Sequence, residues 1–443
     1  MKAVLRAFKV RPEMDRFNSC CGFSRIRTSR LLLMLLLIGG TGCKTQRVTN
    51  PVDTTGTDTT AAGVALDTIA LALPSAPQLA SKGNHSCVLQ VDGRLVCWGN
   101  WGVGPTPPVK VPPPLDREGA QVLFAEVSRG GGGSLCALST EGEAYCITAF
   151  RHVYEPSDSV AAAHVFSRVA TRRRFRAITS SQDISCGLTP GGLGFCWGKG
   201  ENGGLGNGRY GEGYNEVQPV QVASPVLLAS IAVSTTENQC ALSVDGQAYC
   251  WGGQFPSIDF LPELPGDCSD SYWLRFAGRP CTTPTPATSS LRFSMVAVGG
   301  LTLCGLDHVG LANCWGSGTD GQLGDGRSGN GTYSLSPSAV AGDIHYSALA
   351  NRGSSVCGLA LDGRAHCWGS NFRGYLGRIG PPSAVPVPVA GDHVFTSISS
   401  GSLHTCGLDQ MKKVWCWGAA EQGVLGRPDT SGDALEPVPV TMP

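Results

Sequence analysis

The sequence predicts an all-β protein, a seven-bladed β-propeller with four-stranded blades. Two cysteines separated by nine residues recur seven times along residues 76–443, at intervals of 49 to 64 residues. Gly (60 residues) and Pro (29) make up about a fifth of the chain, whereas charged residues make up only 15%. Such a composition is typical of many short strands joined by tight turns.

The leader, residues 1–43, is expected to be an export signal that ends at a lipid anchor. Its apolar run, residues 31–38, follows three arginines and precedes a small-residue stretch that ends at Cys43. Because a membrane-spanning helix needs roughly 20 apolar residues, this run is too short to span a bilayer and is typical of a secretory signal. The translation start is open between Met1 and Met14.

The stretch before Cys43 resembles a bacterial lipobox, in which the cysteine is acylated and becomes the new N-terminus. Gly40 stands where that motif usually has Leu, so an ordinary cleaved signal with Cys43 incidental is the alternative. The resemblance implies an exported lipoprotein. Lys44 at the next position favours the outer membrane or cell surface, with the periplasm as the alternative location.

Residues 44–75 are rich in Thr and show little hydrophobic periodicity, so they are expected to form a flexible tether. The leader holds 8 of the 34 Lys and Arg residues and 2 of the 34 Asp and Glu residues, which leaves 26 basic against 32 acidic residues, a net charge of −6. A mildly acidic body gives no electrostatic reason to expect nucleic acid as a partner. The one dense basic cluster, residues 172–176, is local.

The seven cysteine pairs are expected to be disulfides across β-hairpins. A three-residue turn such as Val91-Asp92-Gly93 lies at the centre of each pair, and pairing outward from it places Cys87 opposite Cys97. The pair then occupies a non-hydrogen-bonded position, where the Cα atoms are about 4.5 Å apart, at the short end of the disulfide range. The predicted disulfides join Cys87 to Cys97, Cys136 to Cys146, Cys186 to Cys196, Cys240 to Cys250, Cys304 to Cys314, Cys357 to Cys367 and Cys406 to Cys416.

The remaining cysteines agree with an oxidising compartment. Cys268 and Cys281 lie in the one long insertion, residues 253–290, and are expected to pair with each other, so that no thiol stays unpaired after Cys43. Zinc binding is the alternative, but zinc sites need cysteines that converge on one point. No metal site, no cofactor and no catalytic residue is predicted.

The third residue of each turn is expected to adopt a left-handed conformation, which Gly accepts without steric cost. Six turns have Gly there, and the seventh has Lys412. Six copies continue from the second cysteine into Trp-Gly, whereas the second copy has Ile147-Thr148, so its blade should be the least regular. Four copies continue further into a Gly-x-Leu-Gly tail, at residues 203–206, 321–324, 374–377 and 423–426.

The unit Gly-x-x-His-x-Cys-x-Leu, a turn, Cys-Trp-Gly and a Gly-x-Leu-Gly tail resembles the repeat of the regulator of chromosome condensation family. Residues 401–408 with Cys416-Trp417-Gly418 match it best, and the resemblance covers about residues 80–443. It implies a seven-bladed propeller with four-stranded blades. Known roles of such proteins include guanine-nucleotide exchange on a small GTPase and inhibition of a secreted β-lactamase. An exported chain would not meet a cytosolic GTPase.

Segments that alternate Pro and Val precede several hairpins, and the last of them, at residues 436–440, has no hairpin after it. This pattern predicts that the ring is closed by the C-terminal strand, with residues 438–442 completing the first blade beside the strands of Cys87 and Cys97. Closure of a ring removes exposed sheet ends.

Function is expected in loops that break the repeat. The insertion carries Tyr272, Trp273 and Arg275, residue types typical of interface hot spots, although the aromatics would also serve to pack the loop onto the body. The sequence therefore predicts a monomeric cell-envelope binding protein that recognises a protein or a glycan and contacts the membrane through its lipid anchor only. The alternative is an envelope polymer hydrolase or lyase with a site assembled from several blades, although no nucleophile elbow, His-Glu-x-x-His or phosphate loop is present.

Overall fold

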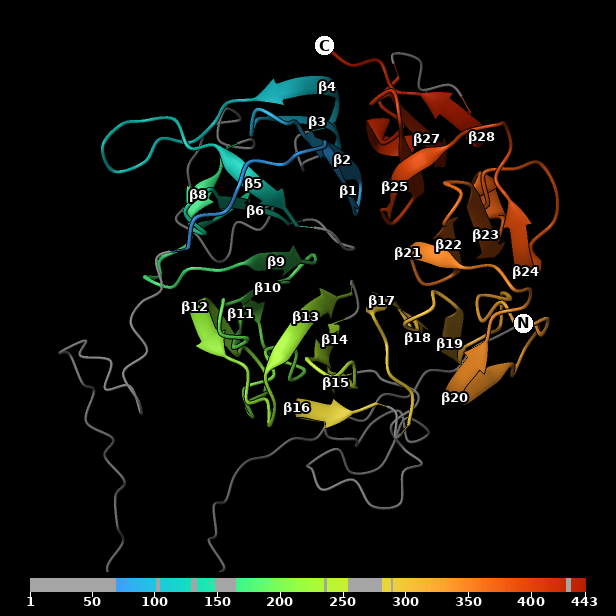
Figure 1. Ribbon diagram of the computed structural model, residues 1–443, viewed down its shortest axis with the longest axis horizontal. Helices are drawn as coiled ribbons and strands as arrows, with labels where there is room; N and C mark the ends of the chain where they lie inside the picture. The colour runs from blue at the N-terminus through green and yellow to red at the C-terminus, as the bar shows by residue number, and fades with distance from the viewer. Residues whose placement is uncertain are drawn as a thin grey trace, which may run out of the picture. The chain divides into compact units, whose positions relative to one another are not determined.

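The chain forms a ring of seven four-stranded antiparallel sheets, which confirms the predicted fold class (Figure 1). The computed structural model describes residues 69–100, 104–128, 134–147, 165–234, 237–253, 281–287, 290–427 and 432–443. Each blade is a contiguous stretch of chain, and its strands follow one another from the central channel outward. Within the described residues the only helices are two 3-10 turns, η2 (Phe372–Gly374) and η3 (Glu421–Gly423).

The strand bounds are as follows. Blade one holds β1 (Gln78–Lys82), β2 (His85–Leu89), β3 (Leu95–Asn100) and β4 (Pro105–Val111), and blade two holds β5 (Phe124–Val127), β6 (Leu135–Ser139), β7 (Ala144–Ile147) and β8 (Ser167–Arg168). Blade three holds β9 (Ala177–Ser180), β10 (Ile184–Leu188), β11 (Gly194–Lys199) and β12 (Asn215–Gln221), and blade four holds β13 (Leu228–Val233), β14 (Asn238–Ser243), β15 (Ala248–Gly252) and β16 (Cys281–Pro286). Blade five holds β17 (Met295–Gly299), β18 (Thr302–Leu306), β19 (Ala312–Ser317) and β20 (Tyr333–Ala339). Blade six holds β21 (Tyr346–Asn351), β22 (Ser355–Ala360), β23 (Ala365–Gly369) and β24 (Ser383–Pro388), and blade seven holds β25 (Phe395–Ser400), β26 (His404–Asp409), β27 (Val414–Gly418) and β28 (Ala434–Pro439).

The second and third strands of each blade pair in the expected register. Cys87 lies opposite Cys97, and Gln90 N donates to Arg94 O at 2.8 Å to close the turn. The third turn residue has a positive φ in every hairpin, including Lys412 at 64°.

Each of the seven predicted cysteine pairs lies across its hairpin with its two sulfur atoms in contact. Their S–S distances are 2.04 to 2.12 Å, and their Cα–Cα distances of 4.0 to 4.1 Å are shorter than the expected value for a non-hydrogen-bonded pair. Each bridge stays within one blade, so none joins two copies of the repeat. The bridges join Cys87 to Cys97, Cys136 to Cys146, Cys186 to Cys196, Cys240 to Cys250, Cys304 to Cys314, Cys357 to Cys367 and Cys406 to Cys416.

The predicted ring closure by a shared strand is wrong. The C-terminal strand β28 pairs with β27, so it completes blade seven, and all four strands of blade one come from residues 78–111. The Pro-Val segments are therefore the outer strands of the preceding hairpins. Pro suits an outer strand because its missing N–H then faces away from the sheet.

The core lies between neighbouring blades, and the recurrent Trp-Gly and Gly-x-Leu-Gly motifs join them. Each buried Trp that follows a blade with a tail donates its indole N–H to a backbone carbonyl of that tail. The bonds run from Trp251 to Gly204, Trp368 to Gln322, Trp417 to Tyr375 and Trp98 to Val424, at 2.9 to 3.3 Å. Trp315 follows blade four, which has no tail, and its indole N–H has no hydrogen-bond partner among the described residues.

Blade two is the least regular, as its missing Trp-Gly predicts. Its outer strand β8 contains only two residues, against six or seven in the other blades. Residues 148–164, which connect β7 to β8, lie outside the described part of the chain.

Candidate binding surface

The propeller has two faces that differ in the length of their loops. The seven turns between second and third strands form one face, here called the hairpin face. Because strands alternate in direction, the connections between third and fourth strands lie at the opposite ends of the blades, and we call this side the long-loop face. The insertion singled out from the sequence, residues 253–290, includes a connection of the second kind, between β15 and β16.

An aromatic and arginine cluster lies on the long-loop face of blade six. We call this cluster, formed by Arg352, Phe372, Tyr375 and Ile379, the blade-six patch. The guanidinium carbon of Arg352 lies 3.3 Å from the centroid of the Tyr375 ring, and the rings of Phe372 and Tyr375 meet edge to face at 6.0 Å. Phe372 and Ile379 are each 67% exposed, which is unusual for large apolar side chains in one connection.

The Arg352 guanidinium is largely buried between the connection that carries the patch and blade seven. One guanidinium nitrogen donates to Ser402 O of blade seven, whereas the buried Nε and Nη1 have no hydrogen-bond partner among the described residues. Burial lowers the pKa of Arg352. Because the guanidinium is covered by the Tyr375 ring and by blade seven, the patch offers a partner the exposed apolar area of Phe372 and Ile379 on a rigid support.

The connection that carries the patch is fixed to blade seven by an ion-pair network. Arg373 binds Asp433 through two bonds of 2.8 Å and binds Glu421 at 2.5 Å. The hydrogen bond to Asp433 raises the pKa of Arg373, and the same bond lowers the pKa of Asp433. Arg373 has a φ of 60°, a strained value for a non-Gly residue that these bonds help to hold. The patch is therefore preorganised.

A second charged cluster lies on the same face at the junction of blades three and four. Lys199 Nζ lies 3.0 Å from Glu237 Oε1 and 3.2 Å from Glu201 Oε2, and the bond to Glu237 raises the pKa of Lys199. Asn202 donates to the other oxygen of Glu237 at 2.6 Å. These charges satisfy one another, so this cluster offers less to a ligand than the blade-six patch.

Three cavities lie along the central channel between the described inner strands. A cavity of about 750 Å³ lies at the hairpin end, with residues 72–78 and the inner strands β5, β9, β13 and β25 around it. A second cavity of about 130 Å³ lies farther along the channel, and a third cavity of about 10 Å³ lies beside Arg352 and Ser402. Most of the described residues that line these cavities are small or apolar, and the charged ones among them are Glu126 and Arg352.

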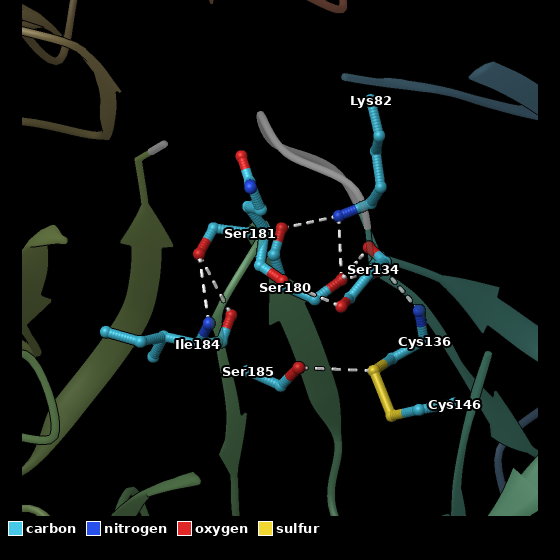
Figure 2. Close-up of a disulfide and its surroundings, with 10 residues drawn as sticks. Lys82, Ser134, Cys136, Cys146, Ser180, Ser181, Ile184 and Ser185 are labelled. Carbon is cyan, nitrogen blue, oxygen red and sulfur yellow. Dashed lines mark hydrogen bonds between the residues drawn. A yellow bond between two sulfur atoms is a disulfide. The ribbon is translucent and has the colours of Figure 1, made fainter. Parts of the chain in front are cut away.

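The long-loop end of the channel contains a buried serine and lysine cluster (Figure 2). Lys82 Nζ, from blade one, donates to Ser180 O at 2.5 Å and to Ser180 Oγ at 2.7 Å, and Ser128 Oγ lies 2.8 Å from Ser180 Oγ. Burial lowers the pKa of Lys82 well below its usual value. Lys82 and Ser180 are fully buried, and a nucleophile without access to a substrate does not support an enzyme.

Two histidines at equivalent positions of their repeats are also fully buried, near the junction of blades seven and one. Burial lowers the pKa of both His85 and His404 to about 3, so both are neutral near pH 7. His404 Nε2 lies 2.6 Å from Ser86 Oγ. These contacts fit a structural role for both rings.

The predicted binding residues Tyr272, Trp273 and Arg275 lie outside the described residues, as do Cys43 and Cys268. Cys281 begins β16 and is disulfide-bonded. The blade-six patch was missed from the sequence because it lies in a connection of ordinary length. The available signal was the run Asn371-Phe372-Arg373, an exposed aromatic and a cation directly before a Gly-x-Leu-Gly tail.

Among the described residues, no three or more His, Cys, Asp or Glu side chains lie together in a way that would hold a metal ion. The same part of the chain contains no helix with the length and apolarity to cross a membrane.

Residues 362–408 and 395–423 match the regulator of chromosome condensation (RCC1) repeat. The fold is similar to yeast RCC1 (Prp20) bound to Kap60, with a TM-score of 0.64 and 17% identity over 88% of this chain and 90% of that one. It is also similar to Prp20p from Saccharomyces cerevisiae, described with its binding to Gsp1p and histones, with a TM-score of 0.61 and 17% identity over 84% and 87% of the two chains. Human WBSCR16 gives a TM-score of 0.61 and 20% identity over 75% and 87%.

Proposed function

We propose that this RCC1-like propeller is a binding protein of the cell envelope, held by an acylated Cys43, that recognises a protein or a glycan through its long-loop face. The observation that carries the proposal is the blade-six patch, in which the exposed side chains of Phe372 and Ile379 lie beside an arginine stacked on Tyr375. Aromatic residues and Arg dominate the energy of protein interfaces.

The sequence supports the envelope as the location. The secretory leader, the lipobox-like stretch before Cys43 and the seven cross-strand cysteine pairs all suit an exported chain. The repeat architecture supports a role in binding, because a propeller presents many loops on a rigid scaffold. Relatives of similar fold, such as yeast Prp20p with Gsp1p and histones, bind proteins.

Affinity capture from envelope extracts tests the proposal. The chain with Phe372→Ser and Ile379→Ser should lose at least about tenfold in capture of its partner, because two exposed anchors at an interface centre are typically worth more than about 1.4 kcal/mol together. Both side chains are mostly exposed, so these changes should leave the fold intact.

A second pair of changes, Trp273→Ala with Arg275→Ala, tests the insertion in the same assay. The matched control is Leu361→Ser with Met411→Ser, two exposed apolar residues of the hairpin face. Equal capture by the wild-type chain and both long-loop variants would refute recognition through this face. Turnover of a glycan or peptide by the wild-type chain would favour the enzyme alternative instead.

A further inference from the structure

The hairpin face carries a ring of exposed apolar side chains at its turns. Five of the seven turns place a large apolar residue at the first or second turn position. The exposed fractions are 41% for Val91, 74% for Val244, 61% for Val309, 71% for Leu361 and 82% for Met411. We call these five residues the apolar tips.

Short loops near the turns add to the apolar character of this face. Leu115, Leu193, Leu227, Leu291 and Val394 are 36% to 63% exposed. Val394 lies directly beside the turn of blade six, and Leu227 beside the turn of blade three, as the surroundings of Gly363 and Gly192 show. The apolar residues thus extend around the ring and are not confined to one blade.

Acidic side chains of the turns are bound to the turns themselves. Asp92 and Asp362 each accept a bond from the backbone N–H two residues on, at 3.1 and 2.9 Å. Asp409 accepts from the backbone N–H groups of Met411 and Lys413 at 2.9 and 2.8 Å. These bonds rigidify the turns, so the apolar tips project from stable supports.

The N-terminal part of the described chain lies on this same face. Leu71 N donates to Thr140 O in the turn of blade two, at 2.6 Å. The side chains of Ile69 and Leu73 lie against the turn glycines Gly142 and Gly93. The chain therefore reaches the hairpin face before it enters β1, and only 25 residues separate Ile69 from Cys43.

We infer that the hairpin face rests on the lipid surface to which Cys43 anchors the chain, with the apolar tips inserted into the headgroup region. The inference rests on the proposed lipid anchor and departs from the expectation that the membrane is contacted through that anchor alone. It also leaves the blade-six patch, on the opposite face, directed toward partners.

The spacing of the tips favours a bilayer over a protein partner. A protein interface needs one contiguous, closely packed core, whereas the tips are separated by charged residues such as Arg94 and Arg364. A fluid lipid interface accepts separate apolar insertions with polar groups between them. Since the turns carry both signs of charge, binding should depend little on anionic lipid.

Vesicle sedimentation tests the inference. The chain is secreted with Cys43→Ser, so that no acyl group contributes, and is mixed with vesicles of phosphatidylcholine, alone or with an equal part of phosphatidylglycerol. The tip variant carries Val244→Ser, Leu361→Ser and Met411→Ser, and its partition coefficient should fall roughly tenfold because interfacial binding scales with buried apolar area. The control carries Phe372→Ser, Ile379→Ser and Leu435→Ser on the long-loop side and should partition like the parent.

The inference is overturned if the parent does not bind vesicles or if tip and control variants lose binding equally. Self-association of the parent without vesicles, abolished by the tip changes in analytical ultracentrifugation, would instead assign the hairpin face to a second copy of the chain. The proposed function has its own readout, because the tip variant should still capture the partner of the blade-six patch. Loss of vesicle binding with capture intact separates the two ideas.

Discussion

The junction between blades six and seven and the junction that closes the ring, between blades seven and one, are built differently. In the first, Phe395 N at the start of blade seven donates to Gly363 O in the turn of blade six, at 2.7 Å. The other five chain-linked junctions repeat this bond, from Phe124 to Gly93, Phe175 to Gly142, Leu228 to Gly192, Phe293 to Gly246 and Tyr346 to Gly310. At the closing junction no described residue of blade one makes such a bond to the Lys412 turn.

The closing junction is held by several hydrogen bonds on its other side. Trp98 donates to Val424 O at 2.9 Å, and Asn100 bonds to Gln422. Near the channel, Ser81 N donates to Ser399 Oγ at 2.8 Å and Ser402 N donates to Gly83 O at 2.8 Å. The ring is thus closed by side-chain and loop contacts toward the long-loop face, without a shared strand.

This difference explains why Lys412 is the one non-Gly residue at the third position of the hairpin turns. A Cβ at Gly363 would lie 3.0 Å from Phe395 O and 2.6 Å from Val394 Cγ1, so the following blade excludes a side chain there. Lys412 has the same left-handed backbone, with a φ of 64°, but no described strand that follows it bonds to its turn. Gly is required at chain-linked junctions for space as well as conformation.

Replacing Trp98 tests the closing junction most strongly. Trp98→Ala should lower the free energy of unfolding by about 3–5 kcal/mol, because it empties a fully buried indole site between blades seven and one. Urea unfolding followed by circular dichroism measures the change. A decrease of less than about 1 kcal/mol in the free energy of unfolding would mean that the stability of the ring does not depend on the closing junction.

The hydrogen bond of Trp98 is separated from its packing by a matched pair of variants. Trp98→Phe should cost about 1 kcal/mol more than Trp315→Phe, because the indole N–H of Trp315 has no partner among the described residues to lose. Equal losses would show that the Trp-to-tail bonds contribute nothing measurable.

Gly363→Ala tests a chain-linked junction and should cost about 2–3 kcal/mol, the sum of left-handed strain and the collision with blade seven. Lys412→Ala is the control and should change the free energy of unfolding by less than about 0.5 kcal/mol. Thermal unfolding of the two variants side by side measures the difference. If both changed stability equally, the two junctions would not differ as described.

The sequence predicted the repeat-internal features well and the contacts between repeats poorly. The register of Cys87 with Cys97 and the left-handed Lys412 follow from turn geometry over a few residues. Turn geometry does not show which blade a Pro-Val strand joins, because a segment between two hairpins can pair with either of them. The structure assigns each such strand to the preceding hairpin. Bonds such as Trp98 to Val424, and the stacking of Arg352 on Tyr375 from a neighbouring loop, depend on packing that periodicity does not encode.

Acid should weaken the closing junction through its buried histidines. Burial lowers the pKa of His404 and of His85 to about 3, whereas an unfolded histidine titrates near 6.5. Between these values the unfolded chain binds more protons, so stability is full above about pH 6.5 and falls as the pH drops toward 3. Each histidine contributes a slope of at most about 1.4 kcal/mol per pH unit.

Urea unfolding at several pH values between 4 and 7 measures this slope. His404→Gln should reduce the slope of stability against pH by up to about 1.4 kcal/mol per pH unit, the contribution of one proton. His308→Gln, at an exposed turn, should leave the slope unchanged. His85, whose pKa burial also lowers to about 3, contributes in the same direction, so the slope should not vanish. An unaltered slope in His404→Gln would place the acid sensitivity elsewhere.

Lys412→Gly has the smallest expected effect and the most specific meaning. Removing a left-handed non-Gly residue should gain about 1–2 kcal/mol, and the extra freedom of Gly in the unfolded chain should offset about 0.4–1 kcal/mol of that. The bonds of Asp409 to the turn involve backbone N–H groups that the change retains. A net stabilisation of up to about 1 kcal/mol in urea unfolding would show that Lys412 destabilises the closing junction. Destabilisation would show instead that the lysine side chain itself helps to hold blades seven and one together.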